Sequence, residues 1–324
     1  MHKREILERL RQESPVSGAE LGRTIGISRT AVWKHINELR RDGYRIDSAP
    51  SKGYYFVDAP DALLPEEIKT GLKTRFLGRQ IVYERETPST QAIAKSLASQ
   101  GAVEGTIVVA ETQSGGRGRV GRLWSSPQGG IYFSIILRPD IKPGEALRLP
   151  LVAGVAAAQA IKRNTKLDPR LKWPNDIMIG GRKVGGILTE MGAEMDRLDW
   201  VIIGIGLNVN TLSMSFPEEI EETTTSLMEA GGKVIPRVKL LQGILAEFES
   251  LYGNLAKHGF EPIRARWKAL SDTIGADVVV TLPSGQIKGL AADIDSDGAL
   301  ILQKDDGVIE RIIAGVVRLR KLQE

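Results

Sequence analysis

Two serine-capped helix patterns separated by a glycine turn limit what the N-terminal residues of this chain can fold into. Ser17, with Glu20 three residues later, is a capping-box signature, and Gly26 supplies the turn after that short helix. Ser28 is the expected N-cap of a further helix that reaches about Asp42. An amphipathic helix pattern precedes both, so the segment is predicted to form a helix-turn-helix.

The second capped helix has an apolar face and a polar face. Val32, Ile36 and Leu39 recur at helical spacing and form its predicted buried face. Strand patterns at 44–47 and 54–57 follow, joined by a basic turn, and predict a wing. The side chains expected to contact DNA are Arg29, Thr30, Lys34, Asn37 and Arg41 on this helix and Lys52 in the turn.

The distribution of charge also favours DNA as a partner. Residues 1–57 carry 11 Lys and Arg against 7 Asp and Glu, and the totals of 44 and 40 leave 33 against 33 for the rest of the chain. The whole positive excess therefore lies in the head, as expected for a segment that meets a polyanion. A small helical domain with a solvated basic face is the alternative.

Length and composition define the class of the whole chain. Its 324 residues predict two or three domains, and 42% hydrophobic and 26% charged residues are typical of a globular protein. The absence of cysteine excludes disulfides and thiolate catalysis. No signal-peptide pattern is present, and the longest apolar stretch, 149–161, is too short to span a membrane. We therefore expect a cytoplasmic protein without a membrane partner.

Strand and helix patterns alternate irregularly after a linker at 58–65, which favours a mixed sheet with covering helices. The predicted strands are 80–84, 106–111, 131–137, 177–179, 184–191 and 200–208. The predicted helices begin near Pro65, at Ser89 (which could cap a helix reaching Gln100) and at Leu149. Strands at 278–282, 287–294, 299–303 and 307–313 predict a small SH3-like barrel at the C-terminus.

A glycine- and arginine-rich segment, GGRGRVGR at 115–122, follows one of the predicted strands. Its glycines allow close approach to a ligand, and Arg117, Arg119 and Arg122 can neutralise phosphate or carboxylate oxygens. It is not a Walker A loop, because GxxxxGK[ST] does not occur in the chain. Since flexible basic loops and RNA-binding segments share this composition, the loop alone is a weak indication of an anion site.

Three further motifs carry polar groups or closely spaced glycines. KWPND at 172–176 contains Asn175, Asp176 and a tryptophan that we expect to be buried. GRKVGG at 181–186 places Lys183 at the start of a strand, where a solvated lysine is the alternative. Strand glycines in GIGLNVN at 204–210 leave room for a flat group or a phosphate, although a bulge is the commoner reason for them.

The missing residue types narrow the chemistry. The histidines, His2, His35 and His258, lie outside these motifs, and no HExxH, Cys/His cluster or GxSxG is present. Zinc catalysis and Ser/His hydrolysis are therefore disfavoured. A site of Arg, Lys, Gly and amides suits the binding and stabilisation of phosphate charge.

The pair Ser89 and Thr90 together with GGRGRVGR, KWPND, GRKVGG and GIGLNVN, in this order, resembles the bifunctional biotin–protein ligases that are also biotin operon repressors. The resemblance covers nearly the whole chain. It implies an α+β multidomain fold with a winged helix-turn-helix at 1–62, a class II synthetase-like mixed sheet at 63–271 and an SH3-like barrel at 272–324. The chain departs from the pattern at Gln91, where Asn is more usual, so the role of Gln91 stays open.

The resemblance implies a reaction in two steps. The biotin carboxylate attacks the α-phosphate of MgATP to give biotinyl-5′-adenylate and pyrophosphate, and a lysine of a biotin carboxyl carrier protein then takes the biotin. Biotin and MgATP are substrates, and no bound prosthetic group is expected. Because a carboxylate is already ionised at neutral pH, the first step needs no histidine base.

Site residues follow from the same resemblance. Lys183 and Arg119 are the expected catalytic residues, between the biotin carboxylate and the α-phosphate. Trp124 is the expected adenine platform, and Asn208 a nucleotide contact. The expected biotin-binding residues are Ser89, Thr90, Gln91, Gln113, Arg117, Gly118, Arg119, Lys183 and Gly186. Asn175 is expected at phosphate or Mg²⁺, Asp176 serves either ligand or fold, and Mg²⁺ arrives with ATP rather than in a protein-only cluster.

The family also implies a switch in which the adenylate orders the loop at 115–122 and favours a homodimer on a two-fold operator. Residues 211–233 are a second candidate mobile loop. Two alternatives stay open: a repressor whose middle domain only senses a metabolite, and a ligase for another carboxylate such as lipoate. Exchange of pyrophosphate into ATP, driven by biotin, another acid or neither, separates the three.

Overall fold

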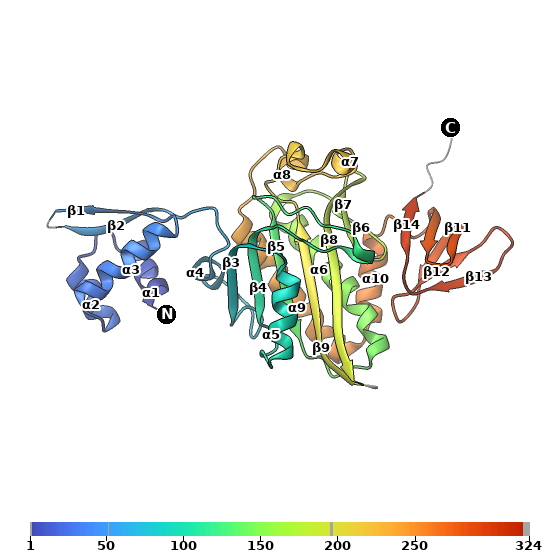
Figure 1. Ribbon diagram of the computed structural model, residues 1–324, viewed down its shortest axis with the longest axis horizontal. Coiled ribbons are helices and arrows are strands. Elements are labelled where there is room, and N and C mark those ends of the chain that lie inside the picture. Colours follow the sequence, from blue (N-terminus) through green and yellow to red (C-terminus); the bar gives the residue numbers. More distant parts are fainter. Residues whose placement is uncertain (1, 51, 195–196, 320–324) are drawn as a thin grey trace. The chain divides into compact units, whose positions relative to one another are not determined.

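The computed structural model describes residues 2–50, 52–194 and 197–319, and the chain divides into two compact units, Met1–Thr70 and Gly71–Glu324 (Figure 1). The first unit contains the predicted helix-turn-helix and a two-stranded antiparallel hairpin. Ser51, in the predicted turn of the wing, and residues 320–324 of the predicted C-terminal domain lie outside the described residues. The elements of the first unit are α1 (His2–Gln12), α2 (Gly18–Ile25), α3 (Arg29–Arg41), β1 (Arg45–Ala49), β2 (Gly53–Asp58) and α4 (Pro65–Lys69).

The predicted caps start the two helices of this motif. Ser17 Oγ accepts a hydrogen bond from the N–H of Glu20, and Ser28 Oγ accepts one from the N–H of Ala31, both at 3.1 Å. Gly26 ends α2 with φ of 76°, a conformation that glycine adopts without steric cost. The core beneath is apolar and fully covered, with Ile6, Leu7, Leu10, Leu21, Val32, Ile36 and Leu39 all at most 2% exposed.

The second unit is built on a seven-stranded sheet with the order β3-β4-β5-β9-β8-β7-β6. β3 and β4 are parallel and the other neighbours are antiparallel, so the predicted mixed sheet is confirmed. Its strands are β3 (Ile81–Thr87), β4 (Ile107–Gln113), β5 (Ile131–Leu137), β6 (Arg170–Lys172), β7 (Asp176–Ile179), β8 (Arg182–Glu194) and β9 (Arg197–Leu207).

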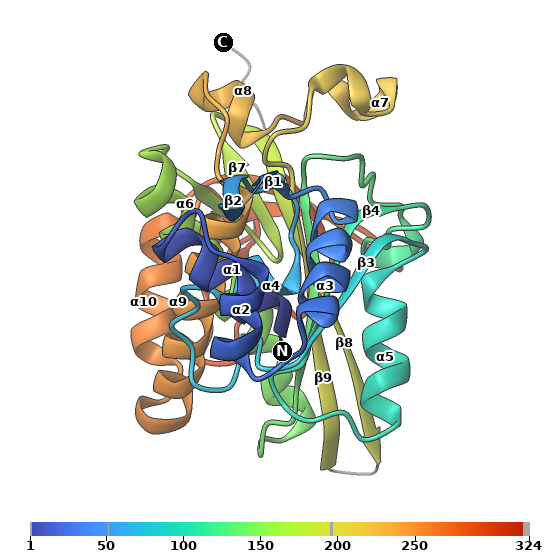
Figure 2. The same ribbon diagram turned by 90° about the vertical axis from the view of Figure 1, so that its left-hand side faces the viewer.

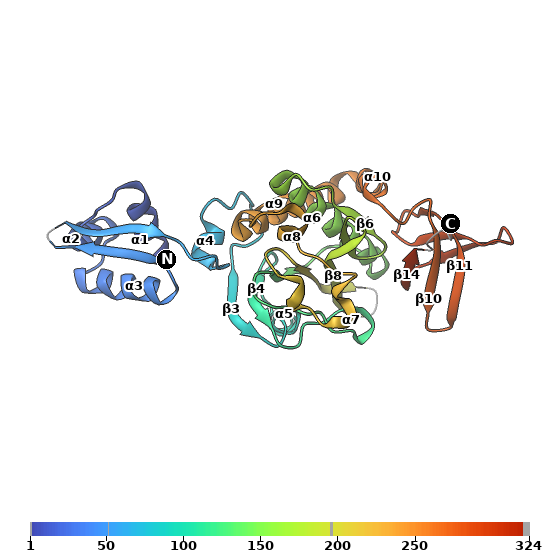
Figure 3. The same ribbon diagram turned by 90° about the horizontal axis from the view of Figure 1, so that it is seen from above.

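Helices cover both faces of this sheet (Figures 2 and 3). α5 (Thr90–Ser99) packs on β4, β5 and β9, whereas α6 (Leu149–Thr165) packs on the other face and carries α9 (Arg237–His258) and α10 (Glu261–Leu270) outside it. The two outer helices are absent from the sequence prediction. The apolar spacing of Leu241, Leu245 and Phe248, all fully buried, is the signal that would have found α9.

Short helical turns complete the connections of the second unit. They are η1 (Arg119–Gly121), η2 (Pro143–Arg148), η3 (Ser213–Ser215), α7 (Glu218–Glu221) and α8 (Leu227–Gly231). Among the described residues, no helix has both the length and the apolar character that crossing a membrane requires.

The C-terminal module is an antiparallel sheet with the order β13-β12-β11-β10-β14. The expected small β-structure is present, but its described strands pair in one open order, and no pair closes a barrel. A fifth strand, β14, is absent from the sequence prediction. The strands are β10 (Asp277–Leu282), β11 (Gly285–Ile294), β12 (Leu300–Gln303), β13 (Ile309–Ile312) and β14 (Val316–Leu319).

Candidate active site

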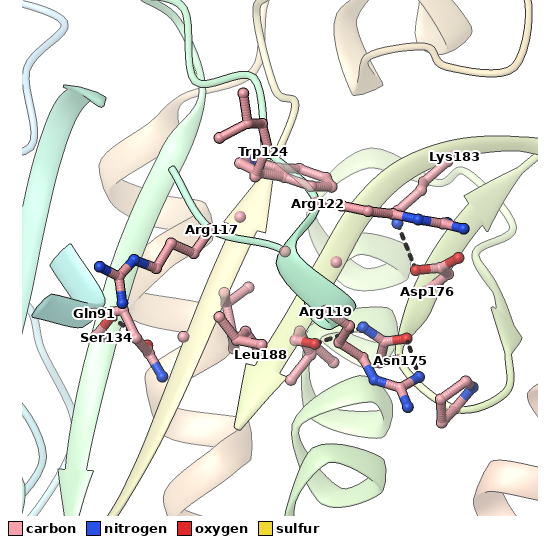
Figure 4. Close-up of a pocket in the computed structure, with 18 of the residues that line it drawn as sticks. Gln91, Arg117, Arg119, Arg122, Trp124, Ser134, Asn175, Asp176, Lys183 and Leu188 are labelled. Atoms are coloured by element: carbon pink, nitrogen blue, oxygen red, sulfur yellow. Dashed lines mark hydrogen bonds and ion pairs between the residues drawn. The ribbon is translucent and has the colours of Figure 1, made fainter. Parts of the chain in front are cut away.

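A cavity of about 150 Å³ lies between the central sheet, the loop at 115–122 and the start of β14 (Figure 4). Its walls combine strand residues with the KWPND and GRKVGG motifs and with GGRGRVGR, which is distant from both in the sequence. The predicted site residues that line it are Ser89, Thr90, Gln91, Gln113, Arg117, Gly118, Arg119, Trp124, Asn175, Asp176, Lys183 and Gly186. The topology thus brings the candidate groups for anion binding and for biotin binding into one space.

One end of the cavity is lined by buried polar side chains. Gln113 Oε1 accepts hydrogen bonds from the N–H of Thr90 at 2.8 Å and from its hydroxyl at 3.2 Å, and Gln113 Nε2 donates to Ser126 Oγ at 2.8 Å. Ser134 Oγ lies 3.0 Å from Thr90 Oγ1. The amide of Gln113 therefore holds the first turn of α5 in place.

Two polar atoms at this end have no hydrogen-bond partner among the described residues: Ser89 Oγ and Gln91 Nε2. Ser89 occupies the predicted N-cap position of α5, and the helix ends at the predicted Gln100, but the Ser89 side chain makes no cap hydrogen bond. Gln91 Oε1 accepts from Ser134 Oγ at 3.0 Å, and a Cβ on Gly204 would lie 2.4 Å from Gln91 Oε1. Since buried polar groups are normally paired, these two atoms are available to a polar ligand.

The strand glycines make room for the Trp124 indole. A Cβ on Gly206 would lie 2.4 Å from Trp124 Nε1, and one on Gly186 would lie 3.0 Å from Trp124 Cζ3. Gly186 and Gly206 face each other in an unbroken stretch of the β8–β9 ladder, so a bulge does not explain them. These two glycines therefore leave room for a flat group, as one of the expected explanations has it. That flat group is the indole of Trp124.

We expect Gly206→Ala to displace Trp124, because the added methyl would overlap the indole. Biotin-dependent pyrophosphate exchange should fall by about tenfold or more, the usual scale for a misplaced site group. Steady-state exchange kinetics with varied biotin and MgATP measure this. Gly253→Ala in α9 is the matched control, since a Cβ there meets nothing within 4 Å. Equal activities of the two variants would contradict the role of Gly206.

The opposite end of the cavity is positively charged. Lys183 Nζ lies 2.6 Å from Asp176 Oδ1 and 5.2 Å from the centroid of the Trp124 ring. Arg119 Nη1 donates to Asn175 Oδ1 at 3.3 Å and to the carbonyl of Gly315 at 3.2 Å (Figure 4 shows the contact with Asn175). Asp176 pairs with Lys183 and also interacts electrostatically with Arg119, so one carboxylate is shared by two cations.

Burial and neighbouring charge affect the cations around Asp176. Burial lowers the pKa of Arg119, with Asp176 opposing and Arg122 adding to the shift. Burial also lowers the pKa of Lys172. The charge of Asp176 opposes this lowering, and the charge of Lys183 adds to it. Because this group has more cations than carboxylates, the end of the cavity favours an anionic ligand.

Two residues of these motifs, Trp173 and Asn208, make contacts that join parts of the fold. Trp173 is 2% exposed, its Nε1 donates to the carbonyl of Gly298 at 3.0 Å and its N–H donates to Thr273 Oγ1 at 2.9 Å, so it joins KWPND to the C-terminal module. The expected burial of Trp173 is confirmed. Asn208 lies outside the cavity, 1% exposed, and its Nδ2 donates to the carbonyl of Thr225 at 3.2 Å.

Several residues that line the cavity were not predicted from the sequence. Ser134 is the one polar residue of the apolar strand IYFSIIL and could have been found from that contrast. Gly315, Val316 and Val317 enter from the C-terminal module, and no local pattern points to them.

The candidate DNA-binding side chains lie on one surface of α3. Arg29, Thr30, Lys34 and Arg41 are exposed, Asn37 is half-buried, and Lys52 is exposed in the hairpin turn. Trp33, which was not among the predicted DNA-contacting residues, lies on the same helix and is 58% exposed.

Comparison with known families agrees with this organisation. Three family models match: an HTH domain at 2–55, the Biotin/lipoate A/B protein ligase family at 83–208 and the Biotin protein ligase C terminal domain at 273–320. The head, the central domain and the C-terminal module are thus those of a biotin/lipoate-type protein ligase that carries a helix-turn-helix.

Individual relatives specify the group. The chain is 44% identical over 294 residues to the bifunctional ligase/repressor BirA of Bacillus subtilis, covering 90% of each chain. It is 31% identical to BirA of Escherichia coli, covering 95% of this chain and 94% of that protein. A biotin protein ligase structure from Aquifex aeolicus, in complex with biotin and ATP, superposes with a TM-score of 0.65 at 32% identity over 75% of this chain and 100% of that chain. The chain belongs to the family of bifunctional biotin ligase/repressors.

Proposed function

We propose that this protein forms biotinyl-5′-adenylate from biotin and ATP, transfers biotin to a lysine of biotin carboxyl carrier protein, and represses transcription in response to biotin. The observation that carries the ligase proposal is the two-ended cavity. Unpaired polar atoms of Ser89 and Gln91 lie at one end, and Lys183 and Arg119 lie at the other. Biotin has a matching polarity, with a ureido ring at one end and a carboxylate at the other.

In this proposal the ureido ring contacts Ser89, Thr90 and Gln91, while Gln113 orients Thr90. The carboxylate and the α-phosphate lie between Lys183 and Arg119. These cations reduce the repulsion between the two anions and stabilise the charge that develops on the α-phosphate as pyrophosphate leaves. The remaining biotin contacts are Arg117, Gly118 and Gly186.

The nucleotide is the second substrate and brings Mg²⁺ with it. We propose Trp124 as the adenine platform and Asn175 as a phosphate or Mg²⁺ contact. Asp176 holds Lys183 until the anions arrive. Asn208 Oδ1 is buried without a partner among the described residues, and in our proposal it reaches the nucleotide after residues 224–226 move.

Transfer of biotin to a carrier domain tests the ligase function. The purified chain, with biotin, MgATP and an apo carrier domain, should increase the carrier's mass by one biotinyl group at a single lysine, as measured by mass spectrometry. Labelling by lipoate alone would favour a ligase for another carboxylate. No labelling with either acid would favour a metabolite-sensing repressor.

For the repressor function, we expect the double variant Lys34→Gln/Arg41→Gln to bind DNA less tightly and with a weaker salt dependence. Each phosphate contact contributes about 0.9 to the slope of log K against log salt, so the slope should fall by up to about 2. Fluorescence anisotropy with DNA selected from a random pool measures it. Arg4→Gln on α1, also exposed, is the control. An unchanged slope for the double variant would reject this face of α3.

We further propose a homodimer with biotinyl-adenylate bound, a cytoplasmic location and the division into domains at 1–62, 63–271 and 272–324. Family membership supports the first two, and the position of the three family matches supports the third. Sedimentation velocity with and without biotin and MgATP tests the dimer. Sedimentation unchanged by the ligands would contradict the switch.

A further inference from the structure

A second cavity, also of about 150 Å³, adjoins the first. The two share Arg119, Trp173, Pro174, Asn175 and Ile187 in their linings. Arg119, whose guanidinium is held by Asn175 and by the carbonyl of Gly315, therefore lies on the boundary between them. Any group that passed along the second cavity would reach the charged end of the first.

The chemical character of the second cavity differs from that of the first. Beyond the shared residues its lining is mainly aliphatic, from the start of α6 on one wall and from the turn before β14 on the other. The unshared residues are Leu147, Pro150, Leu151, Thr189, Gly298, Ile313 and Ala314. Ile313 is 55% exposed and Ala314 is exposed, so this wall reaches the protein surface.

The reaction brings three ligands together, and their chemistry decides which of them fits here. A polyphosphate would lose its hydration in this aliphatic lining, and only one cation, Arg119, is present there to compensate for that loss. Biotin's polar ring matches the unpaired groups of the first cavity. A lysine side chain, by contrast, is an alkyl stem with one terminal nitrogen, and it must arrive from outside. Thr189 Oγ1, buried and unpaired among the described residues, is a polar group that its nitrogen can pass.

We propose that the second cavity admits the side chain of the acceptor lysine of the carrier protein. This inference rests on the proposed ligase function. The lysine stem lies between Leu147 and Ala314, and its nitrogen reaches the acyl carbon beside Arg119. The cavity is thus a specificity-determining site for the transfer step and is separate from the site of adenylate formation.

The lining also assists the chemistry of transfer. The aliphatic surface and the charge of Arg119 both disfavour the ammonium form of the incoming lysine, so they lower its pKa. The lysine therefore loses its first proton to solvent. The neutral amine attacks the acyl carbon of the mixed anhydride and forms the C–N bond. The bond between that carbon and the phosphate oxygen breaks, AMP leaves with its electron pair, and the second proton of the nitrogen passes to solvent.

Filling the cavity from either wall tests the proposal. We expect Ala314→Trp and Leu147→Trp each to lower kcat/KM for the carrier domain by about tenfold or more, while pyrophosphate exchange stays within about twofold of wild type. Single-turnover transfer from the purified enzyme–adenylate complex isolates the step. Val308→Trp, on the same module but outside both cavities and 49% exposed, is the matched control.

Hydroxylamine distinguishes a blocked path from an unreactive adenylate. It is small enough to pass a narrowed cavity, so the two tryptophan variants should release biotin hydroxamate at the wild-type rate. Normal transfer to the carrier by both variants would overturn the proposal, as would a loss of exchange equal to the loss of transfer. Absence of exchange in the wild-type chain would instead reject the ligase function itself.

A measurement on the wild-type protein tests the proposal even if the variants misfold. The single-turnover transfer rate, followed against pH, should level off with an apparent pKa clearly below the ordinary lysine value of about 10.4. A rate that continues to rise to that value would show that the lysine reacts from a water-like environment, and the proposal would fail.

Discussion

Lys183→Met should lower biotin-dependent pyrophosphate exchange by about 10²–10³-fold, the usual cost of losing one preorganised group that stabilises transition-state charge. Methionine keeps an unbranched side chain and removes the charge. The loss is expected mainly in kcat, because charge on the α-phosphate develops as pyrophosphate leaves. Binding of biotin alone should weaken less, and isothermal titration calorimetry separates the two effects.

The matched control for this charge is Lys162→Met. Lys162 also pairs with an aspartate, Asp168, at 3.4 Å, but the pair is exposed and lies outside both cavities. Its replacement should leave exchange unchanged. If Lys183→Met kept more than about a tenth of wild-type exchange, charge stabilisation by Lys183 would be too small for the assigned role.

Arg237→Met should destabilise the second unit by about 3–5 kcal/mol, because it removes one partner of a buried ion pair with Glu111. Arg237 is 1% exposed, its Nη1 lies 2.9 Å from Glu111 Oε2, and it donates to the carbonyl of Gly130 at 2.8 Å. Urea unfolding followed by circular dichroism measures the change.

Two comparison variants make this prediction specific. Arg163→Met breaks an exposed pair with Glu247 between α6 and α9 and should cost at most about 1 kcal/mol. The double variant Glu111→Gln/Arg237→Met removes both buried charges and should recover part of the loss. A double variant less stable than Arg237→Met would show that the buried charge is not the cause.

Much of the fold follows from local patterns in the sequence. Ser17, Gly26 and Ser28 set the helix-turn-helix because a cap or a left-handed turn depends on only a few neighbouring residues. The strand 131–137 was predicted with the bounds of β5, since an apolar run of this length fits a buried strand. Through the family resemblance, the motifs also predicted most of the polar residues that line one cavity, although Asn208 lies outside it.

What could not be predicted depends on tertiary contacts. Gly315 reaches the cavity only because the C-terminal module packs beside KWPND. Trp124 lies over both Gly186 and Gly206 because these two glycines are paired across the β8–β9 ladder. Ser89 is at the N-cap position, yet its hydroxyl makes no hydrogen bond to the helix N–H groups. These contacts join distant segments, and no window along the chain contains them.

The measurement that tests the central claim most directly is biotin-dependent exchange of labelled pyrophosphate into ATP by the purified chain. It requires only the first step, so neither the carrier protein nor DNA affects it. We predict exchange with biotin, none without an added acid, and its near loss in Lys183→Met. No exchange with biotin, or exchange with lipoate in its place, would contradict the assignment of this cavity to biotin adenylation.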